Sequence, residues 1–159
     1  MLGTVTVAKN IRGERRGQKA KRTWTFTSRC AAGECPTVHL VRHRTGGVDR
    51  LTLRRRGAGY YTGQGVFYAP LRCASKLVRR GESVPFTITL RITGAELFTG
   101  VDTASAVHAT YTNRSRRNLT RCVAIPGHDA AVYTGTLVTL PTPPPTTDRP
   151  STYRSPAGS

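Results

Sequence analysis

Few residues of this chain combine the types and the spacing that enzyme chemistry needs. His128 and Asp129 are the only histidine and carboxylate that are adjacent in the sequence, and such a pair can transfer a proton. They follow Pro126 and Gly127, a combination typical of a surface turn. The sequence contains no Gly-x-Ser-x-Gly nucleophile motif, phosphate-binding loop or dinucleotide fingerprint. We therefore predict no catalytic residue and no cofactor.

Metal binding is not expected either. His39 and His43 would share one face of a strand, where four residues of extended chain separate their Cα atoms by roughly 13 Å. That distance is too great for a shared metal ion. Zinc knuckles usually supply a Cys-x-x-Cys pair, whereas the closest cysteines here, Cys30 and Cys35, are separated by four residues. A structural zinc site is therefore a weak alternative.

The four cysteines predict two disulfide bonds. They are Cys30, Cys35, Cys73 and Cys122, an even number in a chain whose hydrophobic content is only 37%. Four cysteines allow three pairings. If Cys30 and Cys35 close a tight loop, Cys73 and Cys122 close a long one, which stabilises the fold by roughly 3–5 kcal/mol. Disulfides indicate an oxidising compartment, and a cytosolic protein with free thiols is the alternative.

The chain opens Met-Leu-Gly-Thr-Val-Thr-Val, without the basic head and apolar stretch of a secretory leader. Met1 is the only methionine and directly precedes a strand-like segment. We expect the true start and its export signal to lie upstream. The expected location is then secreted or cell-envelope, with the cytoplasm as the alternative. No apolar run approaches the roughly 20 residues of a membrane-spanning helix, so no transmembrane segment is predicted.

The chain is strongly basic, with 25 Lys and Arg against 8 Asp and Glu and a net charge of +17. Arginine accounts for 21 of the 25 basic residues. Such a charge attracts nucleic acids and other polyanions, because Lys and Arg neutralise phosphates, and it attracts anionic membrane surfaces. An excess of Arg, Ala, Gly, Pro, Val and Thr is also what a GC-rich coding sequence imposes. Composition alone leaves both interpretations open.

Most basic residues cluster in predicted connections or strand ends, at 12–22, 54–56, 79–80 and 114–117. Aromatic residues at 60–68 lie near one cluster and could stack on the bases of a single strand. They alternate along a predicted strand, however, so several are expected in the core. The candidate polyanion-binding residues are Arg54, Arg55, Arg56, Arg79, Arg80, Arg114, Arg116 and Arg117.

Alternating apolar residues predict β-strands along most of the chain, because successive side chains of a strand point to opposite faces. The clearest run has Val84, Phe86, Ile88, Leu90 and Ile92 on one face. Eight strands are expected, at 3–9, 22–30, 37–43, 48–54, 60–68, 84–93, 104–113 and 131–138.

The segments between these strands are predicted to be irregular. A hairpin turn is expected at 45–47, and glycines at positions 63 and 65 indicate a bulge or a sharp bend. The longer connections are expected to be a flexible stretch at 10–22, basic loops at 70–82 and 114–121, and an irregular stretch at 94–102 with a turn of helix at 95–98.

Eight regularly spaced strands without a convincing helix predict a single antiparallel barrel-like sheet, stapled by disulfides, with a β-sandwich as the alternative. Residues 1–140 form this all-β domain. Residues 141–159 are rich in Pro, Thr and Ser and are expected to be a disordered, extended tail.

Five short segments of the chain form a recognisable set: Arg-Thr-Trp-Thr-Phe-Thr-Ser-Arg-Cys at 22–30, Gly-Glu-Cys at 33–35, Leu-Arg-Arg-Arg-Gly-Ala-Gly-Tyr at 53–60, Ile-Thr-Leu-Arg-Ile-Thr at 88–93 and Tyr-Thr-Gly at 133–135. They include a Trp-x-Phe-x3-Cys opening, a Gly-x-Tyr strand and a closing Tyr-x-Gly. Taken together, the segments resemble a class of secreted or envelope-anchored bacterial β-domains from high-GC genomes, which carry the same three motifs. The resemblance covers roughly residues 3–138 and implies export and a cysteine framework. The class has no assigned chemistry, so no functional residue is carried over.

These observations predict an exported, non-enzymatic cell-envelope domain that binds an anionic polymer through its Arg-rich loops. A nucleic-acid-binding β-barrel is the second hypothesis. A hydrolase-like enzyme that uses His128 and Asp129 is the third.

Overall fold

Alternation of apolar and polar residues produces strands in this protein, as predicted. In the clearest run, Val84, Phe86, Ile88 and Leu90 are each at most 4% exposed, whereas the threonines between them are half-buried and Arg91 is exposed. Burying four large apolar side chains on one face commits that face to the core.

The computed structural model describes residues 1–138 except 29, 31, 32, 99 and 100. The described residues form a single antiparallel sheet without a helix, so no helix in this part of the chain could cross a membrane. The predicted tail at 141–159 lies outside the described residues. The strands are β1 (Leu2–Lys9), β2 (Lys19–Lys21), β3 (Trp24–Thr27), β4 (Thr37–Arg44), β5 (Gly47–Gly57), β6 (Tyr60–Cys73), β7 (Lys76–Phe98), β8 (Val101–Asn113), β9 (Arg117–Asn118) and β10 (His128–Thr136).

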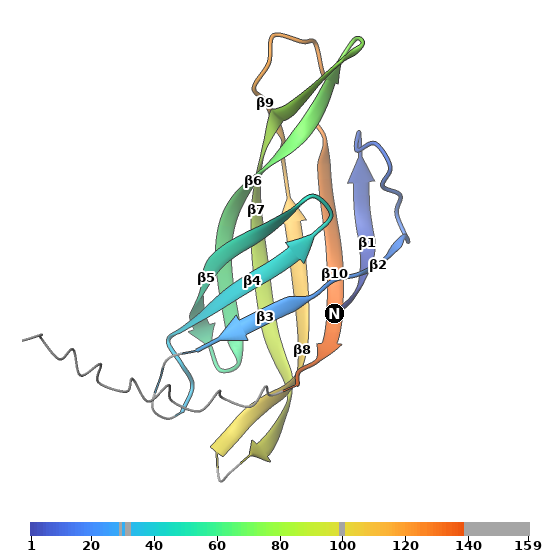
Figure 1. Ribbon diagram of the computed structural model, residues 1–159. Helices are drawn as coiled ribbons and strands as arrows, with labels where there is room; N and C mark the ends of the chain where they lie inside the picture. The colour runs from blue at the N-terminus through green and yellow to red at the C-terminus, as the bar shows by residue number, and fades with distance from the viewer. Residues whose placement is uncertain (29, 31–32, 99–100, 139–159) are drawn as a thin grey trace, which may run out of the picture.

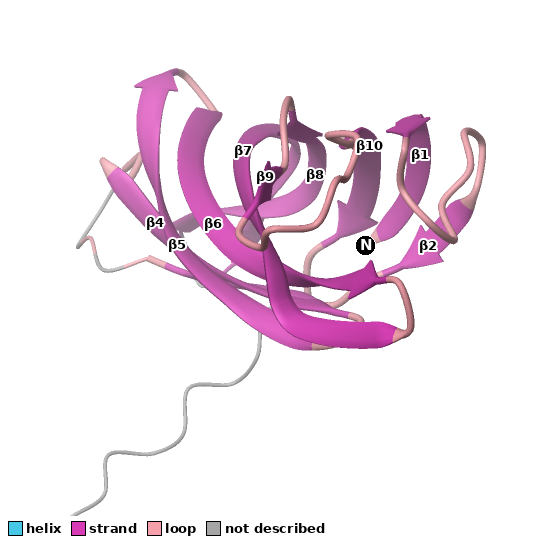
Figure 2. Ribbon diagram, turned by 90° about the horizontal axis from the view of Figure 1, so that it is seen from above, coloured by secondary structure: helices cyan, strands magenta, loops and turns pink. Residues whose placement is uncertain are grey.

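The sheet is curled into a half-barrel, which confirms the predicted barrel-like architecture (Figures 1 and 2). Its strand order is β2-β1-β10-β8-β7-β6-β5-β4-β3, with β9 paired to β7. The two ends of this order, β2 and β3, are consecutive in sequence. Between them, Arg22 and Met1 exchange two hydrogen bonds of 3.0 Å, and the His43 amide donates to the Thr23 carbonyl at 3.0 Å. We call this junction the seam, because here the two ends of the strand order meet.

A continuous core fills the concave side of the sheet. Trp24 on β3 packs against Tyr133 on β10, with ring centroids 5.0 Å apart, although these strands lie far apart in the strand order. The curl therefore brings β3, at one end of the strand order, against β10, near the other end. The core residues are Trp24, Leu40, Leu51, Leu53, Tyr61, Phe86, Ile88, Leu90, Val107, Ala109, Tyr111, Ala131 and Tyr133.

Of the two alternatives predicted at Gly63 and Gly65, a bulge or a sharp bend, the bulge is excluded, because the register between β6 and β7 runs without a shift from Tyr60 to Ala69. The two glycines make room for other groups instead. A Cβ atom on Gly63 would lie 2.7 Å from the Thr52 carbonyl oxygen on β5, and one on Gly65 would meet the Phe86 ring. β5 pairs with β6 only near their shared turn. Gly63 thus marks the corner where β5 leaves the edge of β6 and passes over its inner face.

The predicted basic loop at 70–82 is the tip of the β6–β7 hairpin. Cys73 pairs with Lys76, and Ala74 in the turn between them adopts a φ of 51°. The segment lacks a regular apolar alternation, so local pattern did not predict its pairing. β9, within the predicted basic loop at 114–121, adds two further pairs to β7.

The predicted turn of helix at 95–98 is also wrong. β7 continues through these residues and pairs with β8, with Glu96 opposite Thr103 and Leu97 opposite Asp102. Ala, Glu and Leu favour helices locally, and pairing with a neighbouring strand overrides that preference. β2 lies within the predicted flexible stretch at 10–22, where it pairs with β1. These differences raise the predicted eight strands to ten in the described part of the chain.

A candidate anion-binding pole

All four cysteines are paired. Cys30 bonds to Cys35 and Cys73 to Cys122, and no cysteine is free. This selects one of the three pairings that the sequence allowed, and neither thiol nor zinc-ligand chemistry remains for these residues. The first bond closes a short loop. The second links the β6–β7 hairpin to the segment between β9 and β10, 49 residues later.

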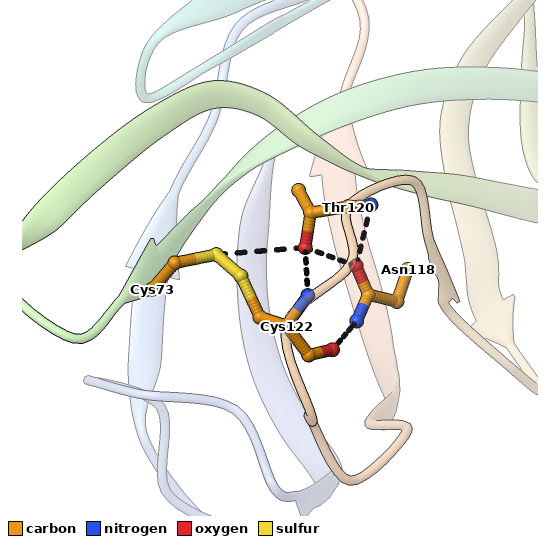
Figure 3. The surroundings of a disulfide bond; sticks show 4 residues. All are labelled: Cys73, Asn118, Thr120 and Cys122. Atoms are coloured by element: carbon orange, nitrogen blue, oxygen red, sulfur yellow. Dashed lines mark hydrogen bonds between the residues drawn. A yellow bond between two sulfur atoms is a disulfide. The ribbon is translucent and has the colours of Figure 1, made fainter.

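The segment that carries Cys122 is folded on itself beside the disulfide (Figure 3). The Asn118 side chain accepts hydrogen bonds from both the amide and the hydroxyl of Thr120, at 2.7 Å, and donates to the Cys122 carbonyl at 2.5 Å. The Cys122 amide donates to the Thr120 hydroxyl at 3.1 Å. The Leu119 amide donates to the Gly81 carbonyl at 2.8 Å. Together with the disulfide, these bonds fix the loop to the hairpin.

Seven exposed basic residues cluster at this end of the molecule. Their segments, the β6–β7 hairpin and the chain from the end of β8 to the start of β10, gather at the top of Figure 1. Glu82 is the only acidic residue at 70–82 and 114–127, and it is not exposed. We name this surface the basic pole; it consists of Arg72, Lys76, Arg79, Arg80, Arg114, Arg117 and Arg121.

Arg116 does not belong to this surface, which corrects the sequence-based selection. Its guanidinium is 11% exposed and lies 3.4 Å from the Glu82 carboxylate and 3.2 Å from the Asp129 carboxylate. Two half-buried or buried carboxylates neutralise it, so it is not available to a ligand. Nothing in the run of three arginines at 114–117 distinguishes it, because both carboxylates come from other strands.

The Arg54, Arg55 and Arg56 cluster lies at the opposite end of β6. This strand runs fourteen residues from the β5–β6 turn to the hairpin tip, or roughly 45 Å. Arg55 forms a salt bridge of 2.9 Å with Glu34, and the Glu34 carboxylate also accepts from the Gly59 amide at 2.5 Å. One of the three charges is therefore partly neutralised. The candidate residues divide into two groups at opposite ends of the molecule.

No protein-family model, curated protein or solved structure matches this chain at the significance threshold. Function is therefore inferred from geometry and chemistry alone.

The structure does not bring His128 and Asp129 together as a catalytic pair. Adjacent residues of β10 project to opposite faces of the sheet. The Asp129 side chain is 9% exposed and pairs with Arg116, whereas His128 is half-buried at the position opposite Lys9. His39 and His43 are both exposed on β4. Among the described residues, no three His, Cys, Asp or Glu side chains are arranged to hold a metal ion.

The sequence analysis missed a buried ionic cluster inside the half-barrel. Arg42 donates two hydrogen bonds to Asp49, at 2.6 and 3.1 Å, and Arg44 also contacts this carboxylate at 3.1 Å. The Arg42 guanidinium lies 4.5 Å from the ring centroid of Phe86 and 4.8 Å from that of Tyr111. Its position two residues after the buried Leu40 was a usable clue, because alternation places it on the inner face. Through Arg42, the cluster brings the β4–β5 hairpin into contact with the core rings of Phe86 and Tyr111.

Burial also shifts the ionisation of neighbouring groups. The pKa of Tyr111 is raised, chiefly by burial and further by the negative charge of Asp129. The pKa of Glu14 is raised by burial first and by Asp129 second, with Arg116 and Arg22 opposing the shift. Tyr111 is buried and Glu14 is half-buried, and the negative charge of Asp129 acts on both.

Proposed function

We propose that this protein is an exported, non-enzymatic domain of the cell envelope and that it binds an anionic polymer through the basic pole. The observation that carries the proposal is the segregation of charge at that pole. Seven basic side chains are exposed there, and the one carboxylate in the same segments is turned inward. A surface with one sign of charge attracts polyanions over several ångströms and raises their association rate.

The loop of the pole is also held in place before it binds. The disulfide and the Asn118 and Thr120 hydrogen bonds fix the loop, and the Arg80 guanidinium lies 3.8 Å from the ring centroid of Tyr68. Ordering side chains and loops opposes binding, so a surface that is already ordered retains more of its contact energy.

A nucleic-acid interface is less well supported. Binding to a single strand uses aromatic faces on which bases stack. Of the four aromatic residues at 60–68, Tyr61 is buried, and Tyr60 is half-buried with the Arg91 guanidinium 5.9 Å from its ring centroid. Phe67 lies under the Arg44 guanidinium, and Tyr68 lies under Arg80. Charge is thus available at the pole, while a row of open aromatic faces is not among the described residues.

Polyanion binding is tested with heparin and inorganic polyphosphate. We expect log affinity to fall with log salt with a slope of about −5 if all seven side chains engage, which is roughly a thousandfold loss between 50 and 200 mM salt. The variant Arg79→Gln/Arg114→Gln/Arg117→Gln should bind about tenfold or more weakly. Arg54→Gln/Arg55→Gln/Arg56→Gln removes the same charge from the other end and is the matched control. Equal losses in the two variants would show that net charge alone attracts the ligand, and the proposal would fail.

Export is tested through the cysteines of protein isolated from its source cells under alkylating conditions. Two disulfide bonds in one small domain are typical of oxidising compartments. We expect no alkylation before reduction and four adducts after it, measured by intact mass. Alkylated cysteines in the freshly isolated protein would place it in a reducing compartment and overturn this part of the proposal.

A further inference from the structure

The basic pole also exposes aliphatic side chains. A partner that offers only anionic charge would make no favourable contact with them. Val123 is fully exposed, Ile125 is 74% exposed, and Leu119 is 53% exposed. All three belong to the segment between β9 and β10 that the disulfide attaches to the hairpin. Single exposed aliphatic residues are ordinary on protein surfaces, but three within seven residues of one loop form an apolar tip.

Charge and apolar surface adjoin each other at this tip. A shallow depression beside the disulfide is lined by Val78, Val123 and Ala74 and is flanked by Arg72 and Arg121. The two guanidinium groups provide planar, bidentate donors for phosphate oxygens. The aliphatic side chains between them suit hydrocarbon. A soluble sugar or phosphate polymer would engage the arginines and gain nothing from the exposed aliphatic residues.

The first part of the loop, up to Cys122, has a backbone that is suited to an interface from which water is excluded. Polar main-chain groups that enter lipid must be satisfied within the protein. The Thr120 and Cys122 amides and the Cys122 carbonyl already bond to the Asn118 and Thr120 side chains (Figure 3). The tip can therefore present its side chains without leaving these main-chain groups unpaired.

We propose that the basic pole docks end-on to the surface of an anionic phospholipid bilayer. The arginines contact lipid phosphates, while Val123 and Ile125 reach the boundary between headgroups and acyl chains. This inference rests on the proposed function, because the same basic residues supply the electrostatic attraction. It identifies the anionic partner as a lipid surface, and the exposed aliphatic residues are the feature that selects it.

The test compares vesicles of phosphatidylcholine with and without phosphatidylglycerol, using co-sedimentation, and measures heparin affinity in parallel. We expect binding only to the vesicles that contain phosphatidylglycerol. Val123→Ser/Ile125→Ser should lower vesicle affinity about tenfold and leave heparin affinity unchanged, because it removes apolar contact and no charge. Leu2→Ser/Leu97→Ser, which removes exposed aliphatic side chains distant from the pole, is the matched control and should bind vesicles as the unmodified protein does.

A Val123→Trp variant gives a second readout. Its added emission should shift to shorter wavelength on vesicles with phosphatidylglycerol and remain unchanged with heparin. Heparin binding without vesicle binding, or vesicle binding that survives Val123→Ser/Ile125→Ser, overturns the membrane inference and leaves the proposed function in place. Failure of the protein to bind heparin or anionic vesicles at all overturns both.

Discussion

Arg42 places a charged side chain among the aromatic rings of the core. The free-energy cost of burying this charge depends on whether a carboxylate neutralises it. Its carboxylate partner, Asp49, lies directly opposite it in the β4–β5 register, and both side chains are at most 7% exposed. A buried ion pair adds little over an apolar pair of similar shape, but removing one member leaves a buried charge uncompensated. Pairing therefore makes the buried charges tolerable, and the hairpin depends on both members being present.

Asp49→Asn should lower the free energy of unfolding by about 3 kcal/mol, because it leaves the buried Arg42 and the neighbouring Arg44 without a negative partner. Urea denaturation measures the change. Asp102→Asn removes an exposed carboxylate and should change stability by less than about 0.5 kcal/mol. Similar losses in the two variants would show that net charge, and not the buried pair, is responsible.

Tyr111 links burial to alkaline pH. Its folded-state pKa is raised above the ordinary value of 10.0, so ionisation of the unfolded chain draws the protein towards unfolding as the pH rises above that value. The stabilisation is fully present below about pH 10 and is lost above it, at up to about 1.4 kcal/mol per pH unit for each such tyrosine. Tyr111→Phe should make this alkaline decline shallower in urea titrations at successive pH values. Parallel declines in the two proteins would contradict the prediction.

At the residue scale, the sequence predicted which side chains alternate inward but not which charges would be paired. Trp24, Val84 and Tyr111 follow from period-two alternation and are buried. Arg116 resembles its exposed neighbours in the same run, and only Glu82 and Asp129 distinguish it. Charge pairing between distant strands depends on register, which no local pattern contains.

At the scale of elements, the corner at Gly63 determines how the sheet curls. β5 must leave β6 after their shared turn in order to cover the core, and its backbone then passes close to Gly63. A glycine inside a strand permits such an approach because it has no Cβ atom. The sequence showed that a glycine within this strand is unusual. The reason that Gly63 must be a glycine is the close approach of the Thr52 carbonyl on β5, which the sequence does not reveal.

Gly63→Ala should destabilise the protein by about 1–3 kcal/mol, since the new Cβ would lie 2.7 Å from both Leu53 Cδ2 and the Thr52 carbonyl oxygen. Thermal and urea unfolding measure the loss. Gly57→Ala places a Cβ where no heavy atom lies within 4 Å and should change stability by less than about 0.5 kcal/mol. A loss at Gly57 as large as that at Gly63 would indicate a general requirement for glycine rather than a steric corner.

The strands that the sequence analysis missed also belong to this scale. β6 and β7 extend beyond the body of the sheet as a two-stranded hairpin that has no core to face. Without an inner face there is no apolar alternation, so the sequence of 70–82 resembles a loop. The cysteines were the better clue, because the bond between Cys73 and Cys122 indicated that this segment is held in place.

At the scale of the whole molecule, the seam and the core make the curled sheet one unit. The core draws side chains from β3 through β8 and from β10, so no group of strands has a core of its own. Domains of this size with one core usually unfold in a single transition. The two groups of exposed arginines are thereby held at fixed ends of one rigid body, which is why variants at the two ends serve as controls for each other.

Trp24, the only tryptophan, reports on the contact between β3 and β10, because its ring packs on Tyr133 across the curl. If the sheet unfolds as one unit, tryptophan fluorescence and far-ultraviolet circular dichroism should give the same urea midpoint. If β3, β4 and β5 separate first, the fluorescence transition will occur at lower urea, because Trp24 becomes exposed while β6, β7 and β8 remain paired. Trp24→Phe should abolish the fluorescence transition and leave the circular dichroism transition in place. This result would assign the fluorescence change to Trp24 and its contact with Tyr133. Two separated midpoints would contradict the single-unit prediction and show that the half-barrel opens before it unfolds.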